Sequence, residues 1–532
     1  MRFTVSTFLF LILFSIFFSC ARRGSPTGGP KDSIPPILVK AIPNIETVNF
    51  KEEKIKIYFD EYIKLKDLKK KLVISPPQKT DPIITPLGTA SKFITIKILD
   101  TLEANTTYTF NFGNSIVDNN EENELGNFKY VFSTGTYIDS LTLTGSIYDP
   151  TIKESIKNID VMLYEYNERY TDSIIYKEKP RYLANTLDST LFDLTNLKGG
   201  KYLLIALKDA NSNKIYEPKI DKIGFIEDTI SLPTTLSYEF PIFKEIPELK
   251  VYPPKEASKG HIIFGFEGNA DNLELELLTQ TPENFNYVVN YEKDKDTLNF
   301  WYSPFEVDSL NFSVSKEDYF QNLSVRLRNS KIDSLKVQKS TSSVLHLLDT
   351  FSISTNTPII KVDTSLIKIF DKDSLLVDFN TILSKSKNKL YINFDKKQNS
   401  SYNFEILPNT ITDIYEISND SLFFKLTTKS LEDYGNIYLN LVSDKQTSFI
   451  VQLLDTKNTL IRRSIIKNPQ IVAFKNLLPG NYLIRVILDE NNSGKWDTGS
   501  FLNRRQPETI MYFNKELELR ANWDLNETFI IN

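Results

Sequence analysis

Short runs of alternating apolar and polar residues fill most of the chain. Residues 54–59 read Lys-Ile-Lys-Ile-Tyr-Phe, and comparable runs return after each cluster of Asn, Asp, Gly and Pro. Alternation with a period of two places the apolar side chains on one face of a pleated strand, and such clusters mark the turns between strands. Apolar residues at helical spacing are confined to 64–71, where one or two helical turns are expected. The pattern therefore predicts an all-β chain of tandem β-sandwich domains.

Changes in the sequence pattern and its motifs divide these runs into successive units. The first unit carries expected strands at 54–59, 72–75, 93–98, 107–112 and 128–133. The two middle units are the least distinct. The expected divisions are 1–19, 20–35, 36–136, 137–243, 244–338, 339–442 and 443–532.

Segments of the unit at 36–136 resemble a known family. They read Ile-Tyr-Phe-Asp-Glu at 57–61, Leu-Glu-Ala-Asn-Thr-Thr-Tyr at 102–108, Ile-Val-Asp-Asn-Asn at 116–120 and Tyr-Val-Phe-Ser-Thr-Gly at 130–135. The acidic strand end, the Asn-Thr-x-Tyr turn, the Ile-x-Asp loop and the closing Phe-x-Thr together resemble the bacterial Ig-like domain of S-layer-type proteins. The resemblance implies a structural or adhesive module and no reaction.

A different sequence motif at 197–217 is repeated at 477–497, with a constant offset of 280 residues. The corresponding pairs are Gly200 and Gly480, Tyr202 and Tyr482, Asp209 and Asp489, Asn211 and Asn491, Tyr216 and Trp496, and Glu217 and Asp497. The Leu-x-x-Gly-x-Tyr signature resembles the transthyretin-like domains of the carboxypeptidase-regulatory and collagen-adhesin B types, which implies small Greek-key sandwiches used as spacers and docking modules. An Asn-x-Ile-x-Asp loop at 114–118 also returns at 409–413, so the order Ig-like then transthyretin-like is expected twice.

The N-terminus predicts export. Arg2 is the only basic residue in 1–19, and an apolar run covers 8–18. That run is shorter than the roughly 20 apolar residues that span a bilayer, but it fits the core of a secretory signal. Ser19-Cys20 at its end resembles the lipobox of bacterial lipoproteins, in the looser form of Bacteroidota. The resemblance implies a signal peptide at 1–19, cleavage before Cys20 and a diacylglycerol on its thiol.

The residues after Cys20 are rich in Gly, Pro and Ser, and they predict a flexible tether at 20–35. Surface-displayed lipoproteins of Bacteroidota often carry an acidic cluster at this place, whereas this chain carries Arg22 and Arg23. The expected location is therefore the outer membrane, held by the lipid, with the periplasmic and the cell-surface faces both open.

The amino-acid composition mainly excludes classes of function and of site. The 532 residues include 63 basic and 68 acidic side chains, a net charge of -5 that offers no field for gathering nucleic acid. Cys20 is the single cysteine, so no internal disulfide is possible. The two histidines, His261 and His346, are too few for a zinc site and are expected to be packed or surface residues. With no Gly-x-Ser-x-Gly turn and no phosphate-binding loop, we expect a protein that is not an enzyme.

Two polar loops are the candidate metal sites. Oxygen-bearing side chains stand at positions 1, 3, 5 and 9, and a backbone carbonyl, that of Lys495 in one loop, falls at position 7, which is the spacing that a calcium loop uses. The candidate ligands are Asp489, Asn491, Ser493, Lys495 and Asp497 in one loop, with Gly494 at its turn, and Asp209, Asn211, Asn213 and Glu217 in the other. Neither loop has a Glu at position 12. Plain turns between strands explain the same residues, because Asn and Asp are ordinary turn formers, so calcium remains one of two interpretations.

Two further surface features are expected. Trp496, Arg504, Arg505 and Trp523 in the last unit are candidate partner-binding residues, because interfaces are enriched in Trp and Arg. Core positions for both tryptophans are the alternative. Triplets such as Asp308-Ser309-Leu310 resemble the O-glycosylation sequon of exported Bacteroidota proteins, and turns leading into strands explain them equally.

The whole chain resembles the Ig-like-domain lipoproteins of Bacteroidota, on the stretches at 20–32 and 504–508. Our first hypothesis is a non-catalytic scaffold that engages an outer-membrane protein, as an accessory of an assembly or export machine. The second is a glycan-binding lipoprotein of the cell envelope, for which three tryptophans are few. A hydrolase on a β-sandwich is the third.

Overall fold

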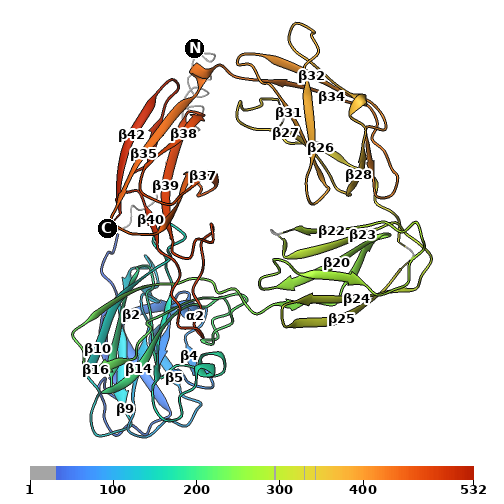
Figure 1. Ribbon diagram of the computed structural model, residues 1–532. Coiled ribbons are helices and arrows are strands. Elements are labelled where there is room, and N and C mark those ends of the chain that lie inside the picture. Colours follow the sequence, from blue (N-terminus) through green and yellow to red (C-terminus); the bar gives the residue numbers. More distant parts are fainter. Residues whose placement is uncertain (1–30, 293–294, 329, 342, 532) are drawn as a thin grey trace, which may run out of the picture. The chain divides into compact units, whose positions relative to one another are not determined.

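The computed structural model describes residues 31–292, 295–328, 330–341 and 343–531 (Figure 1). Strands dominate that part of the chain, and the prediction of tandem all-β sandwiches is confirmed. Two compact units are separated by their internal contacts: residues up to 141 with 195–198, and residues 142–194 with 199–532. No helix among the described residues is both long and apolar enough to cross a membrane. Cys20 and the signal segment lie outside the described residues.

Sandwich 1 is the first set of paired strands. One sheet has the order β4-β5-β2-β7-β8, with β1 on β2, and the other has the order β3-β6-β9. In β2 the alternation read from the sequence places Ile55, Ile57 and Phe59 in the core. The elements are β1 (Leu38–Ile42), β2 (Lys54–Leu65), α2 (Leu68–Lys71), β3 (Val73–Ser75), β4 (Ile83–Thr85), β5 (Ser91–Lys97), β6 (Thr107–Asn111), β7 (Ile116–Asp118), β8 (Glu124–Leu125) and β9 (Lys129–Ser133).

Sandwich 2 follows, with a three-stranded sheet in the order β13-β10-β17 and a second sheet in the order β12-β11-β14-β15, with β16 on β14. Strands β10 and β17 run parallel. The strands are β10 (Leu141–Tyr148), β11 (Asp160–Glu165), β12 (Tyr182–Asn185), β13 (Leu191–Leu197), β14 (Gly200–Lys208), β15 (Lys222–Phe225), β16 (Ile230–Leu232) and β17 (Ser237–Pro241), with a 3-10 helix at Asp172–Tyr176.

Sandwich 3 pairs a sheet of order β18-β20-β23-β22, with β19 on β20, with a sheet of order β21-β24-β25. Its core includes Phe264, Phe300 and Phe312, which are fully buried. The strands are β18 (Lys250–Val251), β19 (Lys255–Ser258), β20 (His261–Glu267), β21 (Glu274–Leu277), β22 (Tyr287–Glu292), β23 (Thr297–Tyr302), β24 (Ser309–Lys316) and β25 (Tyr319–Arg326).

Sandwich 4 repeats the connectivity of sandwich 1. Its sheets have the orders β26-β27-β31-β30, β28-β33 and β29-β32-β34, which match β1-β2-β5-β4, β2-β7 and β3-β6-β9. A tyrosine hydroxyl accepts a backbone N–H at the same corner of both, from Glu103 to Tyr108 at 2.9 Å and from Lys397 to Tyr402 at 2.7 Å. The strands are β26 (Val337–Lys339), β27 (Phe351–Thr355), β28 (Ile359–Val362), β29 (Ile367–Phe370), β30 (Phe379–Leu383), β31 (Lys389–Phe394), β32 (Ser401–Ile406), β33 (Ile411–Asp413) and β34 (Leu422–Thr427).

Sandwich 5 repeats the connectivity of sandwich 2. Its sheets have the orders β38-β35-β42 and β37-β36-β39-β40, with β41 on β39, and β35 and β42 are again parallel. Since β35 pairs with both β38 and β42, the division expected at 442/443 falls inside this strand, and sandwich 5 begins at Gly435. The strands are β35 (Gly435–Ser443), β36 (Ser448–Asp455), β37 (Leu460–Ile466), β38 (Ile471–Leu477), β39 (Gly480–Asp489), β40 (Ile510–Tyr512), β41 (Leu517–Leu519) and β42 (Asp524–Ile531).

Candidate functional site

The polar loop after β14 is held by two carboxylates. Asp209 accepts the backbone N–H of Asn211 at 3.0 Å and that of Lys214 at 2.7 Å. Asp221, which is fully buried, accepts the N–H of Ala210 with one oxygen and that of Glu217 with the other, both at 2.9 Å. The first and the last residue of the loop are therefore tied to one side chain. We call this arrangement a carboxylate clasp.

The loop after β39 has the same clasp. Asp489 accepts the N–H groups of Ser493 at 2.8 Å and Gly494 at 3.0 Å. Glu508 accepts the N–H of Glu490 with one oxygen and that of Asp497 with the other, both at 3.0 Å. Glu490 and Asp497 correspond to Ala210 and Glu217 at the repeat offset of 280. Burial raises the pKa of Glu508, as it raises that of Asp221, although two backbone donors act in the opposite direction in each.

The candidate calcium ligands of the second loop lie together. Asp497 accepts the amide of Asn491 at 2.8 Å and the hydroxyl of Ser493 at 2.6 Å, and that hydroxyl also donates to the carbonyl of Lys495 at 3.0 Å. Burial would raise the pKa of Asp497, but the bonds from Ser493 and Asn491 outweigh it and the pKa lies below 3.8.

In the first loop, Glu217 accepts the amides of Asn211 at 2.7 Å and Asn213 at 3.0 Å. In addition, the Lys214 ammonium lies 2.6 Å from Asp160 and 3.9 Å from Asp209, so a positive charge already stands beside that carboxylate. Gly494 occupies the corresponding position in the second loop.

Among the described residues, no group of three or more His, Cys, Asp or Glu side chains is arranged to hold a metal ion. Calcium in either loop therefore stays a prediction.

The two Ile-x-Asp loops use the same device. Four backbone N–H groups, of residues 120–123, donate to Asp118 at 2.7–3.2 Å. Asp413 accepts the N–H groups of Tyr415 and Ile417, both at 2.9 Å. Burial would raise the pKa of Asp118, but its N–H donors hold that pKa below 3.8. Both carboxylates are buried and stabilise turns.

Sandwich 5 contacts sandwich 2 through a segment that has no counterpart in the first repeat. The stretch from Glu490 to Glu508 is seven residues longer than that from Ala210 to Asp221. Its Phe501 is fully buried, and the ring meets Phe225 edge-on with centroids 5.4 Å apart. We call residues 498–507 the docking segment.

Hydrogen bonds fix the base of the docking segment. The hydroxyl of Thr498 donates to the carbonyl of Lys244 at 2.7 Å, and the N–H of Phe501 donates to Glu245 at 2.5 Å. Gly499 lies against Phe243 so closely that a Cβ there would come within 2.4 Å of the ring. Only glycine fits at this position.

Three of the four expected partner-binding residues are engaged within the chain. Arg504 pairs with Asp172 and donates to the hydroxyl of Tyr170 at 3.0 Å. Burial raises the pKa of Tyr170 to about 12, so its hydroxyl stays protonated and donates to Asp172 at 2.8 Å. Arg505 donates to the carbonyl of Thr498 at 3.1 Å, and the half-buried indole of Trp496 donates to that of Glu508 at 2.9 Å.

Trp523 is the fourth, and 48% of its surface is exposed. The guanidinium of Arg520 lies 5.0 Å from the centre of its ring. Exposed apolar side chains of sandwich 5 also include Ile471 on β38 and Ile530 on β42, whereas Trp523 comes just before β42.

The two histidines are structural. His261 stacks on Trp301 with ring centroids 3.5 Å apart and bonds Asn299 at 2.8 Å. Burial lowers its pKa, so the ring is neutral near pH 7. His346 bonds the carbonyl of Asn476. Both therefore pack as the sequence indicated.

Sequence reasoning missed the residues that close the clasps and the contact. Asp221 and Glu508 lie outside the aligned repeat, because the extra seven residues break the offset between Asp497 and Glu508. The seven-residue insertion in the second copy was the available signal, because it marks the place of the docking segment, which the first copy lacks.

Comparison with known proteins identifies one module. Residues 32–134, which are sandwich 1, match the family described as bacterial Ig-like domain. The protein contains a bacterial Ig-like domain. The resemblance read from 57–61, 102–108, 116–120 and 130–135 is thereby confirmed for the Ig-like sandwich 1.

Several solved structures overlap larger parts of the chain. Domains 1–6 of the surface layer protein SbsC are 11% identical, covering 92% of this chain and 68% of that one, with a TM-score of 0.15. The major pilin subunit BcpA of Bacillus cereus is 9% identical, with coverages of 74% and 99% and a TM-score of 0.14. The Bacteroides ovatus protein SGBP-B, solved with a mixed-linkage heptasaccharide, is 11% identical, with coverages of 70% and 93% and a TM-score of 0.18.

These TM-scores are too low for the overlaps to carry an argument about domain arrangement or function. No curated protein matches the sequence.

Proposed function

We propose that this protein is a non-catalytic scaffold of the outer membrane, anchored by a lipid on Cys20, that engages an outer-membrane protein as an accessory of an assembly or export machine. One observation carries the proposal. The buried carboxylates Asp221, Asp489 and Glu508 use both of their oxygens to accept backbone N–H groups. Carboxylates that accept backbone N–H groups with both oxygens hold loops in place, which is a structural role.

The bacterial Ig-like domain and the repeated sandwiches fit this role. Rigid sheets with loops at their ends present binding residues without needing a cleft. The exposed side chains of Trp523, Ile471 and Ile530 support a partner contact on sandwich 5, because large exposed apolar side chains are common where another protein binds.

Glycan binding at the cell envelope is the second candidate, and the tryptophans count against it. Platforms for sugars need exposed aromatic faces. Trp301 is buried and covered by His261, and Trp496 is held by its bond to Glu508. Trp523 alone of the three is largely exposed.

Affinity capture from detergent-solubilised outer membrane tests the scaffold. We expect a defined outer-membrane protein to co-purify with the full chain and to be lost from the variant Trp523→Ala/Ile471→Asp/Ile530→Asp. This variant keeps sandwich 5 folded, since all three side chains are exposed, whereas a deletion from residue 443 would cut β35. Exposed Leu460 on β37 provides the matched control as Leu460→Asp. A protein that purifies alone, or that hydrolyses a glycan or peptide, contradicts the proposal.

The anchor is tested separately. Cys20→Ala is expected to abolish labelling by a radioactive or alkyne-bearing fatty acid and to release the protein from the outer-membrane fraction. A variant that still fractionates with the outer membrane as the wild type does would show that the anchor lies elsewhere.

A further inference from the structure

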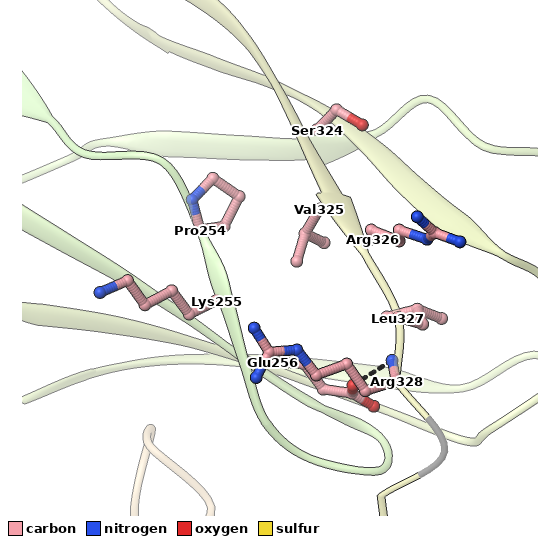
Figure 2. Close-up of a pocket in the computed structure, with 8 residues that line it drawn as sticks. All are labelled: Pro254, Lys255, Glu256, Ser324, Val325, Arg326, Leu327 and Arg328. Carbon is pink, nitrogen blue, oxygen red and sulfur yellow. Dashed lines mark hydrogen bonds between the residues drawn. The ribbon is translucent and has the colours of Figure 1, made fainter.

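A groove opens in sandwich 3 between strands β19 and β25. Figure 2 shows the residues that line it, which come from the start of β19 and from the end of β25 and the turn after it. The groove has a volume of about 740 Å³. Its lining residues are Pro254, Lys255, Glu256, Ser324, Val325, Arg326, Leu327 and Arg328.

The sequence explains why the two strands do not pair. Tyr252-Pro253-Pro254 separates β18 from β19, and two successive prolines remove the backbone donors that a strand would offer to β25. Hydrogen bonds on either side of the prolines bridge the gap. On one side the N–H of Val251 donates to the Tyr319 hydroxyl at 2.9 Å.

On the other side Glu256 closes the gap. One of its oxygens accepts the N–H of Arg328 at 2.6 Å, and the other accepts the hydroxyl of Ser330 at 2.7 Å. The groove is thus fixed at both ends and open between them.

The open edge of β25 presents unpaired backbone groups. Strand β24 is the pairing partner of β25 among the described strands, and the N–H of Leu327 donates to the carbonyl of Asp308, just before β24, at 2.9 Å. Backbone groups of successive residues point to opposite sides of a strand, so those of Ser324 and Arg326 point away from β24. The N–H of Arg328 has the same parity and points outward to Glu256, which agrees with this assignment.

The walls of the groove carry positive charge and an apolar strip. Lys255, Arg326 and Arg328 line it together with one carboxylate, that of Glu256, which is already bonded. Figure 2 shows Arg328 extending back across the groove beside Glu256, whereas Arg326 extends from the other side of β25. Val325 is buried and Leu327 half-buried, so the inner face beside β25 is apolar.

We propose that this groove binds an extended segment of a partner protein in which acidic and apolar residues alternate, added as a further strand to β25. The N–H and C=O groups of Ser324 and Arg326 would pair with the segment, as in other cases of strand addition to a sheet edge. Acidic side chains on one face of the segment would lie beside Arg326 and Arg328, and apolar side chains on the other would lie beside Val325 and Leu327. This inference rests on the proposed scaffold function, for which it names a second contact and its chemistry.

Peptide binding tests it directly. The probe is a fluorescent eight-residue peptide of alternating glutamate and valine, titrated into the full chain in detergent and followed by anisotropy. Two controls keep length and composition matched: alternating lysine and valine, and the same four glutamates and four valines in two blocks. We expect the alternating acidic peptide to bind at least tenfold more tightly than either.

Variants distinguish strand addition from simple charge attraction. Ser324→Pro removes an outward N–H that has no role inside the sheet, and it is expected to weaken binding at least tenfold while the protein melts at an unchanged temperature. Arg326→Glu is expected to weaken binding similarly, and Lys368→Glu on the exposed face of sandwich 4 is the matched charge reversal outside the groove.

Hydrogen exchange reports the geometry. The bound peptide is expected to slow exchange of the Ser324 and Arg326 amides at least tenfold. Equal binding of the block peptide, together with unchanged exchange at these amides or full binding by Ser324→Pro, would mean that the groove is only a basic patch and would overturn the inference. Because these assays need no membrane partner and leave sandwich 5 intact, a failure here is distinguishable from a failure of the scaffold proposal.

Discussion

Glu508 occupies in sandwich 5 the place that Asp221 occupies in sandwich 2. Each carboxylate is buried and joins the first N–H of its loop to an N–H seven residues later. The side chain is one methylene longer in the second copy, where the chain between loop and clasp is seven residues longer. Both copies of the repeat therefore have the clasp, although its carboxylate comes from an aspartate in one copy and from a glutamate at a different position in the other.

Removing a clasp is expected to release its loop. In Glu508→Ala the partly buried N–H groups of Glu490 and Asp497 lose their acceptor, and the cost for each is at most about 1–3 kcal/mol, the figure for a fully buried group left unsatisfied. We expect faster hydrogen exchange at these two amides and a lower melting temperature. Asp228→Ala, at an exposed position of sandwich 2, is the control and is expected to change neither. Unchanged exchange in Glu508→Ala would show that the clasp does not hold the loop.

Phe501 is expected to hold sandwich 5 against sandwich 2. Truncation of a fully buried phenylalanine typically costs about 3–5 kcal/mol, here with the loss of the edge-on contact to Phe225. In Phe501→Ala we expect proteases to cut within 498–507 and the N–H of residue 501 to exchange faster. The neighbouring Leu502 is 56% exposed, so Leu502→Ala is the matched control. If both variants resist proteolysis as well as the wild type does, the docking segment is not held by this ring.

The Ig-like sandwich 1 is expected to lose stability in acid through Asp118. Its backbone N–H donors hold the folded-state pKa below its ordinary value, so its contribution to the free energy of unfolding is present above the unfolded-state pKa and is lost as the pH falls through the folded-state pKa. Asp118→Asn is expected to destabilise sandwich 1 at pH 7 and to flatten this acid dependence. Thermal unfolding between pH 2 and pH 7 measures both, and parallel curves for the two proteins would contradict the assignment.

Calcium, if it binds, is expected in the second loop, because Lys214 already places an ammonium beside Asp209 in the first. Calcium is expected to raise the melting temperature of the wild type by mass action, and Asp489→Ala/Asp497→Ala is expected to abolish the effect. Gly494→Lys, which introduces the residue found in the first loop, is expected to abolish it as well, and Asp209→Ala is expected to preserve it. Equal melting temperatures in calcium and in EDTA would remove the idea.

Much of the fold was predictable because strand formation depends on the pattern of neighbouring residues in the sequence. The alternation in 54–59 gave the buried face of β2, and the motif at 130–135 gave the closing strand of a bacterial Ig-like domain. Divisions were harder to place. Strand β35 has the same sequence pattern whether it ends one sandwich or begins the next, and its pairing with β42, 88 residues later, decides between the two.

The candidate site was predictable only where side chains act within their own loop. Asp489 and Asp497 belong to one turn, so their proximity follows from spacing. Phe501 and Phe225 meet through tertiary packing between separate sandwiches. The alternation of apolar and polar residues predicts strands but not such contacts between domains. The groove beside β25 depends on a missing pairing, and the prolines at 253 and 254 signal the missing donors but not which strand they leave open.

The docking segment has a consequence for the behaviour of many copies. A surface on sandwich 5 that fits a different surface on sandwich 2 is a heterologous contact, and such contacts between molecules propagate into open filaments. When both surfaces belong to one chain, the contact forms within the molecule, at an effective concentration that does not depend on the number of neighbouring copies. The contact is thus satisfied internally, which disfavours filaments of this protein as long as Phe501 packs against the Phe225 of its own chain.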